Sequence, residues 1–181
     1  MLREEFVYIP GSRRDAATLI AHADTVFDSV GSHRVIYIEE TGIIRSEECG
    51  AGIGADDRAG CALLWLLKDS GHNVLLIGYE ERGQPSAHFL AANHPDILRE
   101  IQSSSFMVEF DRRTSDAYRV YDIPVTAEFR AYVEKETGFN EREKGGITDI
   151  CVLCTDGCCG VNVSVGYYNA HSPDEYIVVS E

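Results

Sequence analysis

Residues 73–83 read NVLLIGYEERG, an apolar run that ends in a glycine and a pair of glutamates. The same pattern, an apolar run followed by polar side chains, recurs in ATLIAHAD (17–24), SFMVEFD (105–111) and VNVSVGYYNAH (161–171). Apolar runs of this length predict strands that are buried on both faces of a sheet. In an open α/β sheet, ligands bind outside the carboxyl ends of the strands. We therefore expect the polar residues after these runs to line one cleft.

Helical patterns separate these strands. The remaining elements that the sequence predicts are strands at 4–10, 33–40, 117–122 and 175–180 and helices at 57–69, 86–101 (broken at Pro95), 125–137 and 147–154. Strands that alternate with helices indicate a sheet covered on both faces. We predict a single α/β domain over residues 1–181, with three α/β/α layers and a mixed, mostly parallel central sheet.

The composition limits the class of protein. The chain has 181 residues, is 44% hydrophobic and 25% charged, and carries a net charge of −14. Nucleic acids and anionic membranes require clustered Lys and Arg, so neither is expected as a partner. The sequence offers no signal peptide and no apolar stretch long enough to cross a membrane, which favours the cytoplasm and reduced thiols. The cysteines of CVLCTDGCC (151–159) have poor spacing for a zinc site, and buried thiols are favoured there.

Two of the polar segments pair residue types that metal sites use. His22 alone is more often a structural histidine, but Asp24 follows it closely, and a metal-bound imidazole usually donates its other N–H to such an acceptor. Asp56 and Asp57 open the helix at 57–69, where aspartate is a favoured cap. Two adjacent acids are more than capping needs.

The other three positions also have ordinary alternatives. Glu80 and Glu81 could form a solvated turn after a strand, Asp111 could pair with the arginines that follow it, and His171 could be a turn residue. Taken together, two imidazoles and several carboxylates at one sheet edge are the inventory of a two-metal hydrolytic site.

Three segments carry a family resemblance: GADDRAG (54–60), EERG (80–83) and YYNAHSPDEY (167–176). In this order and spacing they resemble the co-catalytic zinc exopeptidase superfamily, which includes peptidase T and bacterial leucyl aminopeptidase. The resemblance runs from about residue 17 to residue 176. Only 59 residues separate Asp111 from His171, so we expect a catalytic core without the inserted lid and dimerisation domain of the peptidase T branch.

The resemblance implies a role for each residue. Two divalent ions would be held by five ligands, and the ions would be zinc, or else cobalt or manganese. Asp56 would bridge both ions, and its peptide bond to Asp57 would be cis. Glu80 would be the general base, and Asp24 would orient His22. The implied metal ligands are His22, Asp56, Glu81, Asp111 and His171.

The substrate stays open at this stage. The favoured function is an exopeptidase of aminopeptidase type, and the alternatives are an N-acyl amino acid deacylase or carboxypeptidase-like enzyme and a catalytically silent scaffold. Four arginines lie within two residues of the candidate site; they either hold a substrate carboxylate or, as we favour, neutralise the acidic rim, and they are Arg58, Arg82, Arg112 and Arg113. Strand-like terminal segments predict a homodimer that pairs through the first or last strand.

Overall fold

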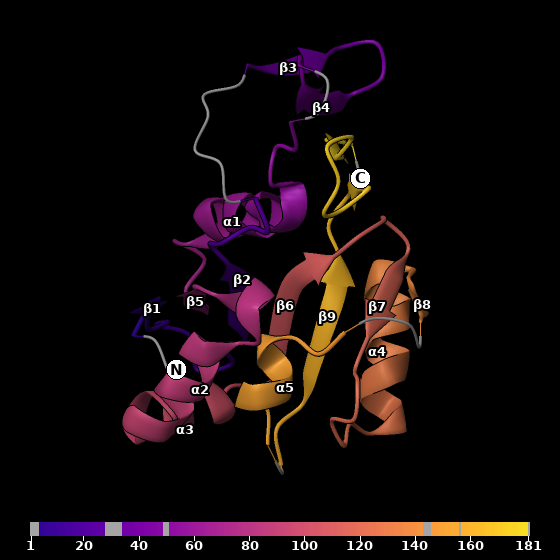
Figure 1. Ribbon diagram of the computed structural model, residues 1–181. Helices are drawn as coiled ribbons and strands as arrows, with labels where there is room; N and C mark the ends of the chain where they lie inside the picture. The colour runs from indigo at the N-terminus through magenta and orange to yellow at the C-terminus, as the bar shows by residue number, and fades with distance from the viewer. Residues whose placement is uncertain (1–3, 28–33, 49–50, 143–145, 156, 181) are drawn as a thin grey trace.

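The computed structural model describes residues 4–27, 34–48, 51–142, 146–155 and 157–180. Its centre is a seven-stranded sheet in which four neighbouring strands run parallel (Figure 1). In spatial order the strands are β1 (Phe6–Ile9), β5 (Asn73–Ile77), β2 (Thr18–His22), β6 (Met107–Arg112), β9 (Gly160–Ser164), β7 (Ala117–Arg119) and β8 (Asn140–Glu141). β1 and β7 are antiparallel to their inner neighbours, so the predicted mixed, mostly parallel sheet is confirmed.

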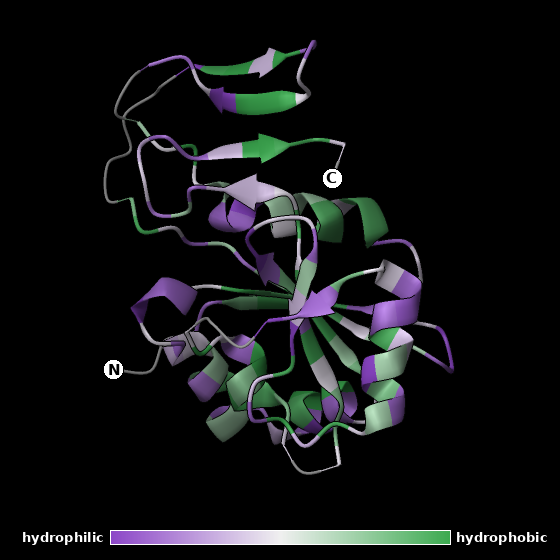
Figure 2. Ribbon diagram, turned by 90° about the vertical axis from the view of Figure 1, so that its right-hand side faces the viewer, coloured by the Kyte–Doolittle hydropathy of each residue, from purple (hydrophilic) through white to green (hydrophobic). Residues whose placement is uncertain are grey.

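Helices cover both faces of this sheet (Figures 1 and 2). On one face α1 (Ala55–Leu67) and α4 (Ala127–Thr137) pack on apolar side chains of β2, β6 and β9. On the other face lie α2 (Pro85–Asn93), α3 (Pro95–Gln102) and α5 (Asp149–Leu153), whose buried residues share one core with Ile20 and Leu75. The three-layer α/β/α fold is therefore confirmed, as is the helix break at Pro95.

A second sheet was not predicted. It has four antiparallel strands in the order β10 (Tyr167–Tyr168), β11 (Tyr176–Val178), β4 (Ile43–Ser46) and β3 (Val35–Ile38), and it stands beside the start of α1 (Figure 2). The strands expected at 33–40 and 175–180 belong here and not to the central sheet. β3 alternates exposed and half-buried side chains, the pattern of a strand with one solvated face.

The strand expected across VNVSVGY also differs. It is divided into β9 and β10, because the chain turns at Gly166, whose φ of +75° is a conformation that glycine adopts at little cost. This turn carries the chain from the central sheet to the second sheet.

The terminal strands differ in their pairing. β1 pairs on one side only and lies at the edge of the central sheet, whereas β11 pairs with both β10 and β4. β11 therefore has no unpaired edge. β1 has the unpaired edge that was expected of a terminal strand. Among the described residues, none of the helices combines the length and the apolar character that crossing a membrane requires.

Candidate metal centre

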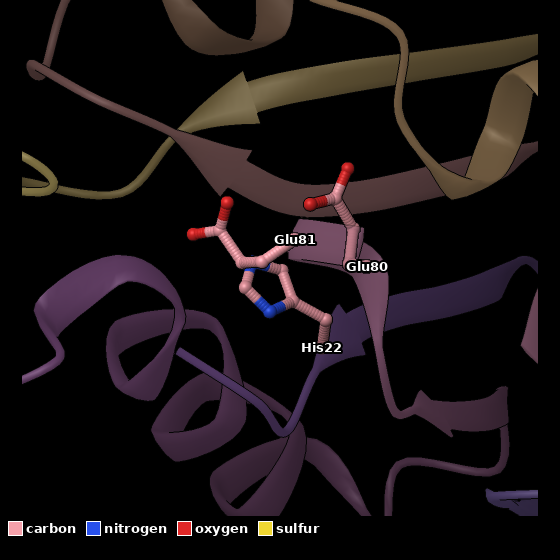
Figure 3. Close-up of side chains that lie close together, drawn as sticks. All are labelled: His22, Glu80 and Glu81. Carbon is pink, nitrogen blue, oxygen red and sulfur yellow. The ribbon is translucent and has the colours of Figure 1, made fainter. Parts of the chain in front are cut away.

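The candidate residues meet at the carboxyl ends of the parallel strands. His22 is the last residue of β2, and Asp111 lies near the end of β6. Glu80 and Glu81 form a 3₁₀ turn, η1 (Glu80–Arg82), just after β5, and Figure 3 shows their side chains gathered with His22. A cavity of about 420 Å³ opens here; its walls include Asp56, Glu80, Glu81, Asp111 and His171.

Asp56 stands between the two imidazoles. Its Oδ1 lies 3.0 Å from His22 Nε2, and its Oδ2 lies 3.1 Å from His171 Nε2. The first imidazole also lies 3.4 Å from Asp111 Oδ1, and the second lies 2.8 Å from Glu81 Oε1. The result is two clusters of potential ligand atoms that share one carboxylate: His22, Asp56 and Asp111, and Asp56, Glu81 and His171.

The chain at Asp56 departs from helical geometry although α1 starts at Ala55. Asp56 and Asp57 have non-helical dihedrals, and the peptide bond between them is cis, as the resemblance implied. The Asp57 carboxylate is fully buried and accepts hydrogen bonds from the backbone N–H groups of His22 (3.1 Å) and Gly60 (3.0 Å). A Cβ on Gly60 would lie 2.1 Å from the Phe110 carbonyl oxygen, so only glycine lets α1 approach β6 this closely.

Asp24 contacts two parts of the site. His22 Nδ1 lies 3.1 Å from the backbone carbonyl oxygen of Asp24 and 3.4 Å from its carboxylate. The same carboxylate accepts the backbone N–H groups of Glu80 (2.9 Å) and Glu81 (3.3 Å). Asp24 thus orients the imidazole chiefly through its main chain, and its side chain fixes the turn that carries the two glutamates.

Several supporting residues were missed from the sequence. Glu175, 1% exposed, accepts the backbone N–H groups of Ala55 (2.8 Å) and Asp56 (3.4 Å). The Thr148 hydroxyl lies 3.0 Å from Asp111 Oδ2 and 2.7 Å from Glu109 Oε1. Glu175 lies within YYNAHSPDEY and could have been found there, whereas Thr148 carries no sequence signal.

Burial and charge shift the protonation of the site. Burial raises the pKa of Glu80 to about 7, and the negative charge of Asp111 adds to this. Burial alone would lower the pKa of His22, but hydrogen bonds to the carboxylates of Asp111, Asp24 and Asp56 outweigh it and raise that pKa. These carboxylates therefore stabilise a positive charge on the His22 imidazole.

The acids beneath the site have few partners. Asp149 is fully buried, and neither of its carboxylate oxygens has a hydrogen-bond partner among the described residues. Burial raises the pKa of Asp149 and of Glu109 well above the usual range, and neighbouring negative charges raise it further. The crowding of acids thus favours the protonated forms of Asp149 and Glu109, and cations bound at the two ligand clusters would offset the charge of the carboxylates that stay ionised.

The donor set fits a pair of divalent ions. Imidazole nitrogens and carboxylate oxygens are the ligands that suit zinc, cobalt and manganese. One oxygen of Asp56 belongs to each cluster, which is the arrangement of a bridging carboxylate. A third grouping joins His22, Glu80 and Glu81, but Glu80 Oε1 already accepts a hydrogen bond of 2.8 Å from Gln84 Nε2. Glu80 is therefore held beside the clusters by a partner of its own.

Solved peptidase structures share this fold. No protein-family model matches the sequence, and no curated protein matches it. The aminopeptidase PepT from Bacillus cereus is 16% identical with a TM-score of 0.64, and a tripeptidase from Staphylococcus aureus is 14% identical with a TM-score of 0.65; each alignment covers 97% of this chain and 79% of the other. An aminopeptidase from Desulfurococcus kamchatkensis is 14% identical over 96% of this chain and 78% of its own, with a TM-score of 0.56.

These identities establish the fold alone. The resemblance read from the sequence is thereby confirmed at the level of fold: the chain has the fold of these solved peptidase structures.

Proposed function

We propose that the chain is a di-metal hydrolase that cleaves amide bonds, most specifically an exopeptidase of aminopeptidase type. One observation carries the proposal: the two oxygens of Asp56 face two different imidazoles, while Glu80 lies beside both clusters on a hydrogen bond to Gln84. This is a division into ligands and a separate proton acceptor, which metal-assisted hydrolysis requires.

The ions would be held by His22, Asp56, Glu81, Asp111 and His171. When bound, a pair of divalent ions supplies an activated water and polarises the scissile carbonyl. Glu80 accepts the proton of the attacking water and later delivers it to the amine nitrogen as the C–N bond breaks. The products are a carboxylic acid and a free amine. Asp24 holds the η1 turn in place, so that the Glu80 carboxylate stays at the position from which it moves this proton.

The similarity in fold to two aminopeptidases and a tripeptidase favours a peptide as substrate. An N-acyl amino acid deacylase or carboxypeptidase-like enzyme would use the same metal centre and bind its substrate through a different group. A scaffold without activity is the alternative from another class. The presence of both ligand clusters and of Glu80 supports an enzyme over a scaffold.

A matched pair of variants tests the proposal. Glu80→Gln and Glu81→Gln make the same chemical change at neighbouring positions of one turn. Glu80→Gln is expected to keep both zinc ions and to lose about 10²- to 10⁴-fold in kcat, because only the proton acceptor is removed. Glu81→Gln is expected to lose zinc affinity first, since it removes a ligand. Metal analysis and a screen of aminoacyl, peptide and N-acyl amino acid substrates provide both readouts.

The two outcomes are separable. Zinc-loaded wild-type protein that hydrolyses no amide in the screen would favour the scaffold. Equal loss of zinc in both variants would make Glu80 a ligand and would overturn its assigned role.

The remaining expectations stay proposals. We propose that residues 1–181 act as one catalytic domain without a lid, that the protein works in the cytoplasm without nucleic acid or membrane partners, and that it forms a homodimer.

A further inference from the structure

A second cavity adjoins the candidate metal centre. It measures about 660 Å³, within the range of small-molecule pockets, and none of the five candidate ligands lines it. The two cavities share three residues of their walls: Tyr121, Gly146 and Ile147. The two cavities therefore adjoin each other at these residues, and the second cavity lies next to any molecule bound at the metal centre.

The boundary between the cavities combines an apolar side chain with a tyrosine that is held by a hydrogen bond. Ile147 is 69% exposed and contributes apolar surface to the linings of both cavities. Tyr121 has a φ of +54°, and its hydroxyl is hydrogen bonded to Asn162 Nδ2 at 3.1 Å. The same Asn162 amide donates to the Asp111 carbonyl oxygen at 3.1 Å. The wall is thus tied to the strand end that presents a candidate metal ligand.

The second cavity combines an apolar floor with a cation. Ile123, Pro124 and Cys154 supply apolar surface. The Arg119 guanidinium lies over the Tyr121 ring, 4.4 Å from its centroid, which sets its position by a cation–π contact. The only acid that lines this cavity among the described residues is Asp122, which is exposed to solvent.

Further positive charge lies in the lining of the first cavity. Arg112 and Arg113 line the first cavity, and the charges of Arg119 and Arg113 both act on the Arg112 guanidinium. Three arginines on the linings of the two cavities thus lie within electrostatic reach of one another, in a chain whose net charge is −14. A planar guanidinium fork matches a carboxylate better than any other side chain does.

We infer that the second cavity is the subsite for the leaving segment of the substrate, in which the floor takes an apolar side chain and Arg119 takes a carboxylate. The inference rests on the proposed function, which places the scissile bond in the first cavity. The carboxylate has two chemical sources, the free C-terminus of a short peptide or an acidic side chain, and Arg119 suits both.

Three dipeptide substrates with a common first residue, chosen in the screen above, distinguish these sources. The second residue is phenylalanine with a free carboxylate, phenylalanine amide, or glutamic acid with its α-carboxylate amidated. The zinc-loaded proteins to compare are wild type, Arg119→Gln, Arg119→Lys and the control Arg13→Gln, which removes an arginine paired with Asp15 on another part of the surface.

The wild type is expected to hydrolyse at least one carboxylate-bearing substrate with about 10- to 100-fold higher kcat/KM than phenylalanine amide, the effect of a hydrogen bond to a charged group. Arg119→Gln should remove this preference, so that kcat/KM for the carboxylate-bearing substrate falls to about that for phenylalanine amide in the same variant. Arg119→Lys should keep part of it, and Arg13→Gln all of it. Which carboxylate is preferred identifies its source.

Two results would overturn the inference: equal kcat/KM for all three substrates in the wild type, or an equal loss for all three in Arg119→Gln. Both leave the proposed function standing. If the zinc-loaded protein hydrolysed none of the three substrates, this result would contradict both the proposed function and the subsite.

Discussion

Replacing Asp24 with alanine distinguishes the support that this residue gives to His22 from the support that it gives to the turn of Glu80 and Glu81. The sequence assigned Asp24 to orient His22, but the nearest acceptor to His22 Nδ1 is the backbone carbonyl oxygen of Asp24, which every residue retains. What alanine removes is the carboxylate that accepts the N–H groups of Glu80 and Glu81.

The magnitude follows from these two hydrogen bonds. One is 2.9 Å long and the other 3.3 Å, and both end on a charged acceptor. Hydrogen bonds to charged groups contribute about 1.5–3 kcal/mol each, and the longer one contributes less. We therefore expect Asp24→Ala to lower the free energy of unfolding by about 2–4 kcal/mol. The turn loses its anchor, and a displacement of about 1 Å at Glu80 would lower kcat by about 10²-fold.

Urea denaturation of the metal-free protein measures the first effect, and steady-state hydrolysis by the zinc-loaded protein measures the second. Asp24→Asn keeps one oxygen for the Glu80 N–H and should recover about half of the lost stability. A loss of less than about 0.5 kcal/mol in Asp24→Ala, the range of ordinary surface substitutions, would contradict the role assigned to this carboxylate. A loss of zinc affinity as large as that of His22→Ala would contradict it too, because the side chain would then be the main support of the imidazole.

Three further predictions concern the metals, the buried acids and the assembly. His22→Ala or His171→Ala should retain about one zinc ion per chain and Asp56→Ala fewer, because only Asp56 belongs to both clusters; mass spectrometry of dialysed protein measures this, and two ions in Asp56→Ala would contradict it. Burial raises the pKa of Asp149, so the native state keeps a proton that the unfolded chain releases above about pH 4, and stability falls as pH rises from there. Asp149→Asn should therefore stabilise the metal-free protein against urea by at least about 1 kcal/mol at pH 8 and by less at pH 5, and a larger gain at pH 5 would reverse the argument. The homodimer should pair through β1, where Val7 is 56% and Ile9 is 44% exposed, and light scattering that gives a monomer at micromolar concentration would exclude it.

The central sheet could be predicted because its strands are buried on both faces. β2 and β9 are buried at every position, and such strands read as continuous apolar runs that end abruptly. The ends of these runs locate the candidate residues, since parallel strands finish at one edge. His22 and Asp111 are placed in this way by the sheet itself.

The second sheet gave a weaker signal because its strands are short and half-exposed. β4 and β11 are only four and three residues long, and none of the residues of β11 is fully buried. Their pairing joins residues more than 130 positions apart, as in Ile44 with Ile177, and local patterns do not report such contacts. The roles of Asp57 and Glu175 depend on which backbone groups lie opposite them, which only the folded chain decides.

The second sheet nevertheless has a place in the chemistry. His171 follows β10, and Glu175, just before β11, holds the backbone of Ala55 and Asp56. Asp57 ties that same segment to His22 at the end of β2. The central sheet thus supplies one imidazole, the second sheet supplies the other, and Asp56 lies where the two meet. Removing the contact between Glu175 and this segment would loosen the shared carboxylate relative to both imidazoles at once, so the second sheet is as much a part of the candidate centre as the strands that reveal it in the sequence.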